Sequence, residues 1–210
     1  GENHLFGDRT LVAVKVYKDL EARSFKNDNI YRQGRMMGGE RDERAVNQRS
    51  KHGLAVQQHV WVIYEYTQLW QLHKAGIPVP RPLVGPGIQD IEASGRVVLM
   101  EWIGTEEAPA PRLSDVRLEQ EEAQSAFEQS VDLLSKIVAL GKVHGDYSTY
   151  NLLYWQGKVI VIDVPQMVDI ETNKNAKELL ERDVRSLCMS FKKLDVHANP
   201  AAILRRVQRG

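Results

Sequence analysis

Residues 142–166 read KVHGDYSTYNLLYWQGKVIVIDVPQ, and this stretch decides how the rest of the chain is interpreted. It begins with a polar segment, 144–151, and later contains the pair Gln156-Gly157, a two-residue turn that favours a β-hairpin. Two short apolar strands are expected on either side of this turn, at 152–155 and 158–162. Asp163 follows the second strand directly. The sequence therefore predicts a polar loop that leads into a hairpin with an aspartate at its end.

Three polar side chains in this stretch have the spacing of a phosphoryl-transfer site: Asp146, Asn151 and Asp163. Such a reaction needs one acid that orients the attacking hydroxyl and oxygen ligands that hold magnesium across the phosphates. The spacing matches the known H-R-D-x-x-x-x-N loop of protein kinases and the metal-binding Asp after it, and the assignment rests on that match. Alone, D-x-x-x-x-N is weak evidence, because turns are rich in Asp and Asn for local hydrogen-bonding reasons.

The order of the elements before this loop strengthens the interpretation. The run LVAVKVY at 11–17 alternates with a period of two and predicts a strand with Lys15 in its middle. The segment 56–74 predicts a helix buried on more than one side, with Glu65 on a largely apolar surface. Because unpaired buried charges are costly, we expect Lys15 and Glu65 to form an ion pair that leaves the lysine able to contact phosphates. In the alternative, Lys15 reaches solvent and Glu65 pairs elsewhere.

The remaining elements suggest two lobes, 1–103 and 104–210. A strand at 96–103 ends the first lobe, which also contains 23–52, a basic segment with eight Lys or Arg against four Asp or Glu that predicts a loop. The second lobe contains the hairpin. Helices are expected there over 118–140, from about Asn173 and from Pro200.

Six segments together resemble the RIO kinases, an atypical group with the protein kinase-like fold. They are VAVKVYK at 12–18, AGIPVPRP at 75–82, LMEWIG at 99–104, HGDYSTYNLLY at 144–154, VIVIDVPQMV at 159–168 and ERDVRSL at 181–187. The resemblance covers most of the chain and suggests a bacterial-type or related member. It implies an α+β, two-lobed protein kinase-like fold, with a small β-rich N-terminal lobe that holds one key helix and a mainly helical C-terminal lobe. No activation segment is expected, because only about ten residues separate Asp163 from the next helix.

The resemblance also implies roles for single residues. Lys15 would contact phosphates, Glu65 would be its partner and Asp146 would be the catalytic base. Asn151 and Asp163 would bind ATP and its Mg²⁺, with Mn²⁺ as an alternative ion. The hinge against adenine would be formed by Met100, Glu101 and Ile103. A supporting contact from Asp183 to the catalytic loop and a structural, backbone-bonded His144 are expected as well.

The implied function is that of an ATP-dependent serine/threonine kinase or ATPase, which acts on an unknown protein or on itself and is linked to ribosome maturation. One alternative is a small-molecule phosphotransferase of the aminoglycoside or choline kinase type, although those usually have a loop closer to HGDLHPGN. Another is a nucleotide-gated assembly factor that binds ribosomal RNA through 23–52 and the cluster Arg205, Arg206 and Arg209.

Upstream of Lys15, the family pattern requires a glycine-rich loop, yet residues 1–10 read GENHLFGDRT. We expect that loop to precede the sequence given, and its absence would instead favour a pseudoenzyme.

The composition of the chain excludes several classes of protein and of site. The chain has 210 residues, with 28 Lys plus Arg against 28 Asp plus Glu, so global attraction to nucleic acid or anionic lipid is absent. A single cysteine, Cys188, excludes an intramolecular disulfide and a cysteine zinc cluster. No apolar run is long enough to cross a membrane. A cytoplasmic monomer is the expectation.

Overall fold

The computed structural model describes residues 11–17 and 51–209 of the chain. Residues 1–10 and most of the predicted basic loop at 23–52 lie outside this part, so what the sequence predicts for them stays a prediction. Helix α3 (Lys51–Lys74) begins earlier than the predicted start at residue 56. Its first turn is polar and has no apolar periodicity from which a start could be predicted.

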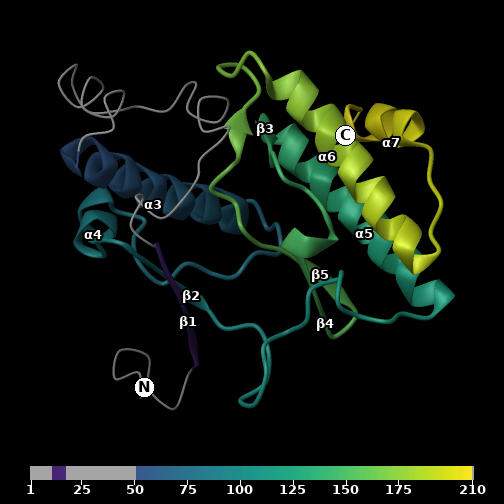
Figure 1. The fold of residues 1–210 in the computed structure, drawn as a ribbon, viewed down its shortest axis with the longest axis horizontal. Coiled ribbons are helices and arrows are strands. Elements are labelled where there is room, and N and C mark those ends of the chain that lie inside the picture. Colours follow the sequence, from purple (N-terminus) through teal and green to yellow (C-terminus); the bar gives the residue numbers. More distant parts are fainter. Residues whose placement is uncertain (1–10, 18–50, 210) are drawn as a thin grey trace.

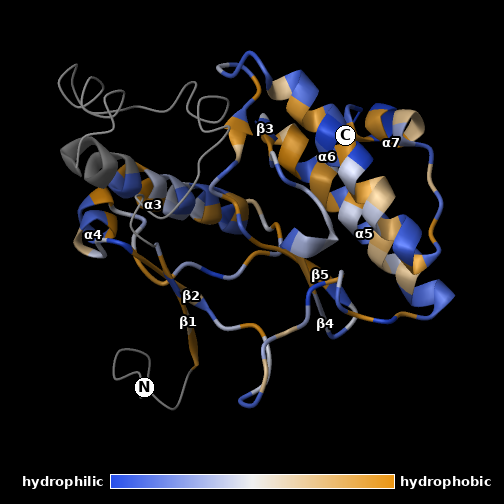
Figure 2. Cartoon of the chain, in the orientation of Figure 1, coloured by the Kyte–Doolittle hydropathy of each residue, from blue (hydrophilic) through white to orange (hydrophobic). Residues whose placement is uncertain are grey.

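The first sheet consists of β1 (Val12–Val16) and β2 (Val97–Glu101), which pair antiparallel with Lys15 opposite Val98. Figure 2 shows β1 as a strongly apolar strand. The two faces of this strand differ in burial, because Val14 and Val16 are exposed by 57% and 59% while Tyr17 is buried. The face that carries Lys15 and Tyr17, not the valine face, is therefore the one that packs inside the molecule.

The proline-rich segment after α3 lies along the other edge of β2. Gly76 adopts a left-handed conformation (φ 72°) just beyond the helix, as expected for a helix-terminating glycine. Two backbone hydrogen bonds then join the segment to β2, from Glu101 N to Arg81 O (2.8 Å) and from Leu83 N to Leu99 O (3.0 Å). Prolines cannot donate to a ladder, which is why such a segment is tolerated only at an edge.

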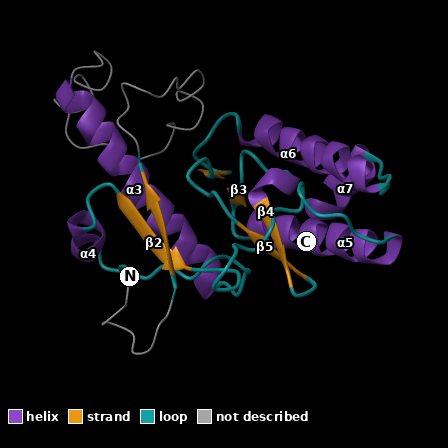
Figure 3. Cartoon of the chain, turned by 60° about the horizontal axis from the view of Figure 1, so that its bottom comes forward, coloured by secondary structure: helices purple, strands orange, loops and turns teal. Residues whose placement is uncertain are grey.

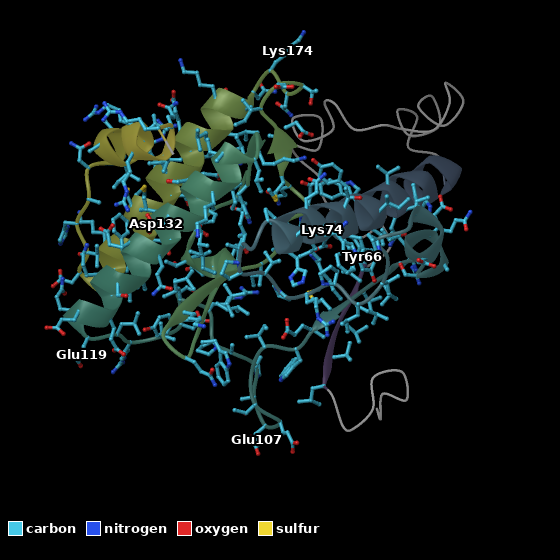
Figure 4. All side chains as sticks on the ribbon, turned by 180° about the vertical axis from the view of Figure 1, so that it is seen from behind. Tyr66, Lys74, Glu107, Glu119, Asp132 and Lys174 are labelled. Carbon is cyan, nitrogen blue, oxygen red and sulfur yellow. The ribbon has the colours of Figure 1, made fainter. Side chains whose placement is uncertain are left out.

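Helix α3 is buried on several sides, as predicted. Tyr66, labelled in Figure 4, ties it to β2, since its hydroxyl accepts a hydrogen bond from Leu99 N (2.8 Å) and donates one to Val97 O (3.2 Å). A short helix, α4 (Ile88–Ala93), packs against α3 with Ile91 buried. Six residues are too few to show a helical period, so α4 was not predicted.

Three helices form the second part of the molecule: α5 (Gln120–Ala139), α6 (Ala176–Phe191) and α7 (Pro200–Val207). Helix α5 begins with a capping box between Glu119 and Glu122. The rings of Phe127 and Phe191 meet edge to face at 5.2 Å between α5 and α6. At the start of α7, the side chain of Asn199 accepts hydrogen bonds from two backbone N–H groups.

The predicted hairpin is present as β4 (Leu152–Trp155) and β5 (Lys158–Val161). Gln156 and Gly157 both have positive φ angles, 50° and 75°, as a tight hairpin turn requires. Two further two-residue strands, β3 (Lys142–Val143) and β6 (Val168–Asp169), pair with each other. Two 3₁₀ turns complete the elements, η2 (Thr149–Asn151) and η3 (Lys192–Leu194).

Figures 1 and 3 show two groups of elements, one with β1, β2, α3 and α4, the other with α5, α6, α7 and the short strands. Hydrogen bonds join them, from Val161 N to Pro78 O and from the Tyr64 hydroxyl to Met167 O, both 2.8 Å. The arrangement confirms the α+β fold with a small antiparallel sheet and a mainly helical part, while the lobe boundary at residue 103 stays a prediction. In the described ranges, no helix has the length and apolar character needed to cross a bilayer.

Candidate active site

Lys15 and Glu65 form the expected ion pair, with Nζ 2.7 Å from Oε1. Glu65 is only 1% exposed, because α3 holds it against the inner face of β1. Its second oxygen, Oε2, accepts a hydrogen bond of 2.5 Å from the hydroxyl of Tyr17. Both oxygens of this buried carboxylate are therefore satisfied. Tyr17 was missed as a site residue, although its position two residues after Lys15 on the same strand face was a usable signal.

Lys15 has a second carboxylate partner, Asp163, whose Oδ1 lies 2.7 Å from Nζ. Burial alone would lower the pKa of Lys15, but the attraction of Glu65 and then of Asp163 outweighs it and raises the pKa above its ordinary value of 10.5. The ammonium group is therefore charged at neutral pH. It connects the first sheet to a residue that lies 148 positions later in the chain.

Asp163 lies two residues after the end of β5 in a left-handed backbone conformation (φ 59°), which Asp tolerates better than most residues. A backbone hydrogen bond from Ile162 N to Asn151 O (3.0 Å) ties the residue before it to the polar loop 144–151. Because of this bond, the backbone just before Asp163 lies next to the backbone of Asn151.

In the loop itself, Asn151 contacts Asp146 twice. The amide Nδ2 donates to the Asp146 carbonyl at 2.8 Å and to its Oδ2 at 3.0 Å. Asn151 is 8% exposed, whereas Asp146 is exposed between buried neighbours. The Asp146 carboxylate is thus oriented from one side and accessible from the other.

Helix α6 holds the backbone around Asp146. The two carboxylate oxygens of Asp183 accept hydrogen bonds from Gly145 N (2.8 Å) and Tyr147 N (3.0 Å), and Arg182 donates to the Gly145 carbonyl. Burial raises the pKa of Asp183, and the nearby His144, these N–H donors and Arg182 oppose that effect. The contact expected between Asp183 and this loop is present, whereas Arg182 was not predicted.

His144 is fully buried and bonded to backbone, as expected of a structural histidine. Its Nε2 lies 3.3 Å from the Ile162 carbonyl, and its Nδ1 accepts a hydrogen bond from Asp146 N at 3.4 Å. The ring therefore links the end of the hairpin to the loop.

A cavity of about 350 Å³ opens beside these groups. Apolar side chains from β1, α3, the hinge after β2 and the hairpin form much of its wall, among them Ala13, Leu69, Met100, Ile103, Leu153 and Ile162. Lys15, Glu65, Asn151 and Asp163 line it as well, together with the predicted hinge residue Glu101 and with Trp102. Asp146 does not line this cavity, but its carboxylate is hydrogen-bonded to Asn151, which does.

The hinge residue Ile103 lines this cavity. The Ile103 carbonyl accepts from Ala110 N (2.8 Å), while the Ile103 N–H has no acceptor in the described part of the chain. After Ile103 the chain reverses tightly at Gly104. Only glycine fits there, because a Cβ would lie 2.4 Å from the Ala108 carbonyl oxygen. A side chain at position 104 would therefore displace the hinge.

Asn151 and Asp163 have the donor chemistry that a magnesium ion prefers, and both line this cavity. The Nδ2 of Asn151 is used as a donor toward Asp146, which leaves its amide oxygen as the group that can face the cavity. Asp163, whose side chain is 44% exposed, supplies carboxylate oxygen at the same cavity. Mg²⁺ prefers oxygen ligands and commonly takes one or two from the protein, with the others from phosphates and water. Within residues 11–17 and 51–209 there is no group of three or more His, Cys, Asp or Glu suited to a metal.

Arg206, one of the three arginines of the basic cluster, has two carboxylate partners, because its guanidinium contacts Glu128 Oε2 and Asp132 Oδ1, both at 2.6 Å. RNA binding through this cluster stays a prediction. Asp132 is labelled on α5 in Figure 4, so this arginine joins α7 to α5. Cys188 is buried on α6, as expected of a packing residue.

Comparison with known proteins places the chain in a family. The RIO domain model matches residues 4–202. The RIO-type serine/threonine-protein kinase Rio1 of Haloferax volcanii is 33% identical, over 93% of this chain and 60% of that protein. The protein of the same name from Thermoplasma acidophilum is 32% identical, over 93% of this chain and 92% of its own. The serine/threonine-protein kinase RIO3 of Mus musculus is 32% identical, but this chain spans only 32% of its length. On this evidence, the chain belongs to the RIO domain family.

Proposed function

We propose that the chain is an ATP-dependent serine/threonine kinase of the RIO type, which transfers the γ-phosphoryl group of ATP with magnesium. The observation that carries this proposal is the position of Lys15 Nζ, 2.7 Å from both Glu65 and Asp163. Three residues from distant parts of the chain thereby bring a fixed cation and a metal-binding carboxylate to a largely apolar cavity. A nucleoside triphosphate needs this combination, because its base is flat and apolar while its phosphates are highly charged.

The cavity suggests how the nucleotide lies. Adenine would occupy the space between Ala13 and Leu153, with a ring nitrogen accepting from the Ile103 N–H. The phosphates would then point toward Lys15 and Asp163. In this pose, the charged groups of the ligand meet the charged groups of the protein.

The chemistry follows from the groups at the polar end. Asp146 orients the acceptor hydroxyl and takes its proton, while a bond forms from the hydroxyl oxygen to the γ-phosphorus and the bond to the β-phosphate oxygen breaks. Lys15 stabilises the negative charge of the phosphates. Magnesium, held by Asn151 and Asp163 when bound, would neutralise charge on the β- and γ-phosphoryl oxygens. Asp183 and Arg182 keep the backbone on both sides of Asp146 in place.

The first prediction tests Asp146. In Asp146→Ala, we expect phosphoryl transfer to fall by roughly 100-fold or more, because the group acts mainly in the transition state. The affinity for ADP should change by less than about 3-fold, since Asp146 does not line the cavity. Turnover measured with radiolabelled ATP and affinity measured by calorimetry separate the two effects. Asp115→Asn, an exposed acid outside the cavity lining, is the control.

Equal turnover of Asp146→Ala and wild type would contradict the assignment of Asp146 as the base.

The acceptor class is proposed to be a protein serine or threonine, in a partner or in the chain itself, because the relatives are named serine/threonine-protein kinases. Transfer to aminoglycosides or amino alcohols, and not to protein, would instead support the small-molecule alternative.

A further inference from the structure

Arg112 lies on the wall of the cavity, and the backbone fixes its direction. It stands opposite Leu153 of β4 in an isolated antiparallel bridge. Hydrogen bonds flank this pair on both sides, from Leu113 N to Leu152 O (2.8 Å) and from Tyr154 N to Pro111 O (2.9 Å). Directly opposed residues of antiparallel strands place their side chains on the same face. A pair with hydrogen bonds on both sides of it, and none between its own residues, has the shorter of the two Cα–Cα distances found in such sheets. Arg112 and Leu153 are therefore neighbours on one face, and both line the cavity.

Arg112 differs from the other charged residues of the cavity wall, because its side chain has no charged or hydrogen-bonding partner within residues 11–17 and 51–209. Lys15 is bonded to Glu65 and Asp163, and Glu101 Oε2 accepts from Arg81 N at 3.2 Å. The Arg112 side chain is exposed and makes neither a hydrogen bond nor an ion pair with the described residues. Its charge is thus available to a ligand, whereas that of Lys15 is already shared between two carboxylates.

The position also suits an anionic ligand. Leu153 lies two residues after Asn151, which ends the 3₁₀ turn just before β4, so at most about 7 Å separates their Cα atoms. Arg112 lies across from Leu153 at the short spacing of about 4.5 Å that such pairs have. A long arginine side chain at this point is within reach of a group held between the apolar wall and the metal-binding pair.

We propose that Arg112 is a phosphate-binding residue of the nucleotide site, which contacts the polyphosphate from the hairpin side, opposite Lys15. This inference rests on the proposed function. Guanidinium groups are donors only, keep their charge at all relevant pH values and match two phosphate oxygens at once. Arg112 is therefore a determinant of nucleotide affinity that discriminates phosphorylated from unphosphorylated ligands.

The test compares ADP with adenosine, both with magnesium and the complete chain, by calorimetry. In Arg112→Gln, we expect the dissociation constant for ADP to rise about 10-fold while that for adenosine stays within about 2-fold. Arg112→Lys should recover part of the loss, since it keeps the charge but not the two-point geometry. Arg117→Gln, a second exposed arginine of the same segment that does not line this cavity, should match wild type.

The failures are distinguishable. If wild type binds neither ligand, the proposed function is wrong. If wild type prefers ADP and Arg112→Gln keeps the whole preference, only the role of Arg112 is refuted. An equal weakening of ADP and adenosine would also refute it, because it would indicate a change in cavity shape and not a lost phosphate contact. Unchanged ADP affinity with a raised KM for the acceptor would reassign Arg112 to the acceptor.

Discussion

At the scale of single residues, Glu65 determines the position of the charged groups around it. It is almost inaccessible, so its ionised form requires donors at both oxygens, and Lys15 and Tyr17 supply them. Lys15 is in turn held where it also meets Asp163. The geometry of the cavity's polar end therefore follows from the need to satisfy one buried carboxylate.

The second prediction measures the coupling of this pair. Among the described residues, Lys15→Met leaves Glu65 with only the Tyr17 hydroxyl as a partner. It should lower the free energy of unfolding by about 2 kcal/mol, less than for a fully buried pair because the Lys15 side chain is 29% exposed. Adding Glu65→Gln should cost less than the sum of the single changes, by about 1 kcal/mol. Denaturant unfolding at pH 7 provides the values. Lys158→Met, at an exposed strand position, is the control, and strict additivity would contradict the coupling.

The third prediction concerns pH. Because the pKa of Lys15 is raised on folding, its contribution to stability is complete below its ordinary value of 10.5 and is lost as the pH rises through the higher value of the folded protein. The difference in unfolding free energy between wild type and Lys15→Met should thus be constant from pH 7 to 9 and smaller at pH 11. The same difference at pH 11 as at pH 8 would show that Lys15 does not gain its charge stabilisation from the fold.

At the scale of elements, short connections position the site more than the long helices do. The hinge reverses at Gly104, where φ is 147° and the chain returns so closely that a Cβ would meet backbone atoms of Ala108, Pro109 and Ala110. The loop that follows extends away from the body, with Glu107 near its tip in Figure 4. Ile103, which lines the cavity, is consequently held in place by a reversal that only glycine allows.

The fourth prediction tests this reversal. Gly104→Ala should destabilise the protein by about 2 kcal/mol or more and weaken ADP binding, since the methyl group clashes with backbone that cannot yield without moving the hinge. Gly95→Ala is the matched control, because Gly95 also has a positive φ (63°) but open space around its Cβ position, and it should cost only about 1 kcal/mol. Thermal unfolding and calorimetry report both effects. Similar costs at the two positions would argue against a steric role for Gly104.

At the scale of the molecule, a ligand in the cavity would contact both groups of elements. Ala13 and Lys15 come from the first sheet, whereas Asn151, Leu153 and Asp163 come from the polar loop and the hairpin with its end. The direct bonds between the groups include those at Pro78 and Tyr64. A bound nucleotide should therefore add to the cohesion of the whole chain.

The fifth prediction measures this addition. At about 100 times its dissociation constant, ADP with magnesium should stabilise the protein by about 2.7 kcal/mol, which corresponds to roughly 5–10 °C in Tm for a chain of this size. Asp163→Asn should abolish the part of the shift that depends on magnesium. Asp90→Asn, an exposed acid on α4, should leave it intact. A magnesium effect of wild-type size in Asp163→Asn would exclude Asp163 as a metal ligand.

Much of the fold could be predicted because local patterns encode it. The turn Gln156-Gly157, the long periodic helices and the glycines at their ends each act within a few residues. The pairing of Lys15 with Glu65 was also predictable, since two charges in apolar surroundings need each other. Elements with too few residues to show a period, such as α4, β3 and β6, could not be predicted in this way.

The sequence by itself determined the hairpin, the polar loop before it and the family to which the chain belongs, because these depend on residue order over short spans. Only the tertiary structure decided that β1 turns its lysine face inward, that Lys15 also reaches Asp163, that Arg206 is used between α5 and α7, and that Arg112 lines the cavity. These are relations between residues far apart in the chain. They are set by how the elements pack, which leaves no periodic signal in the sequence.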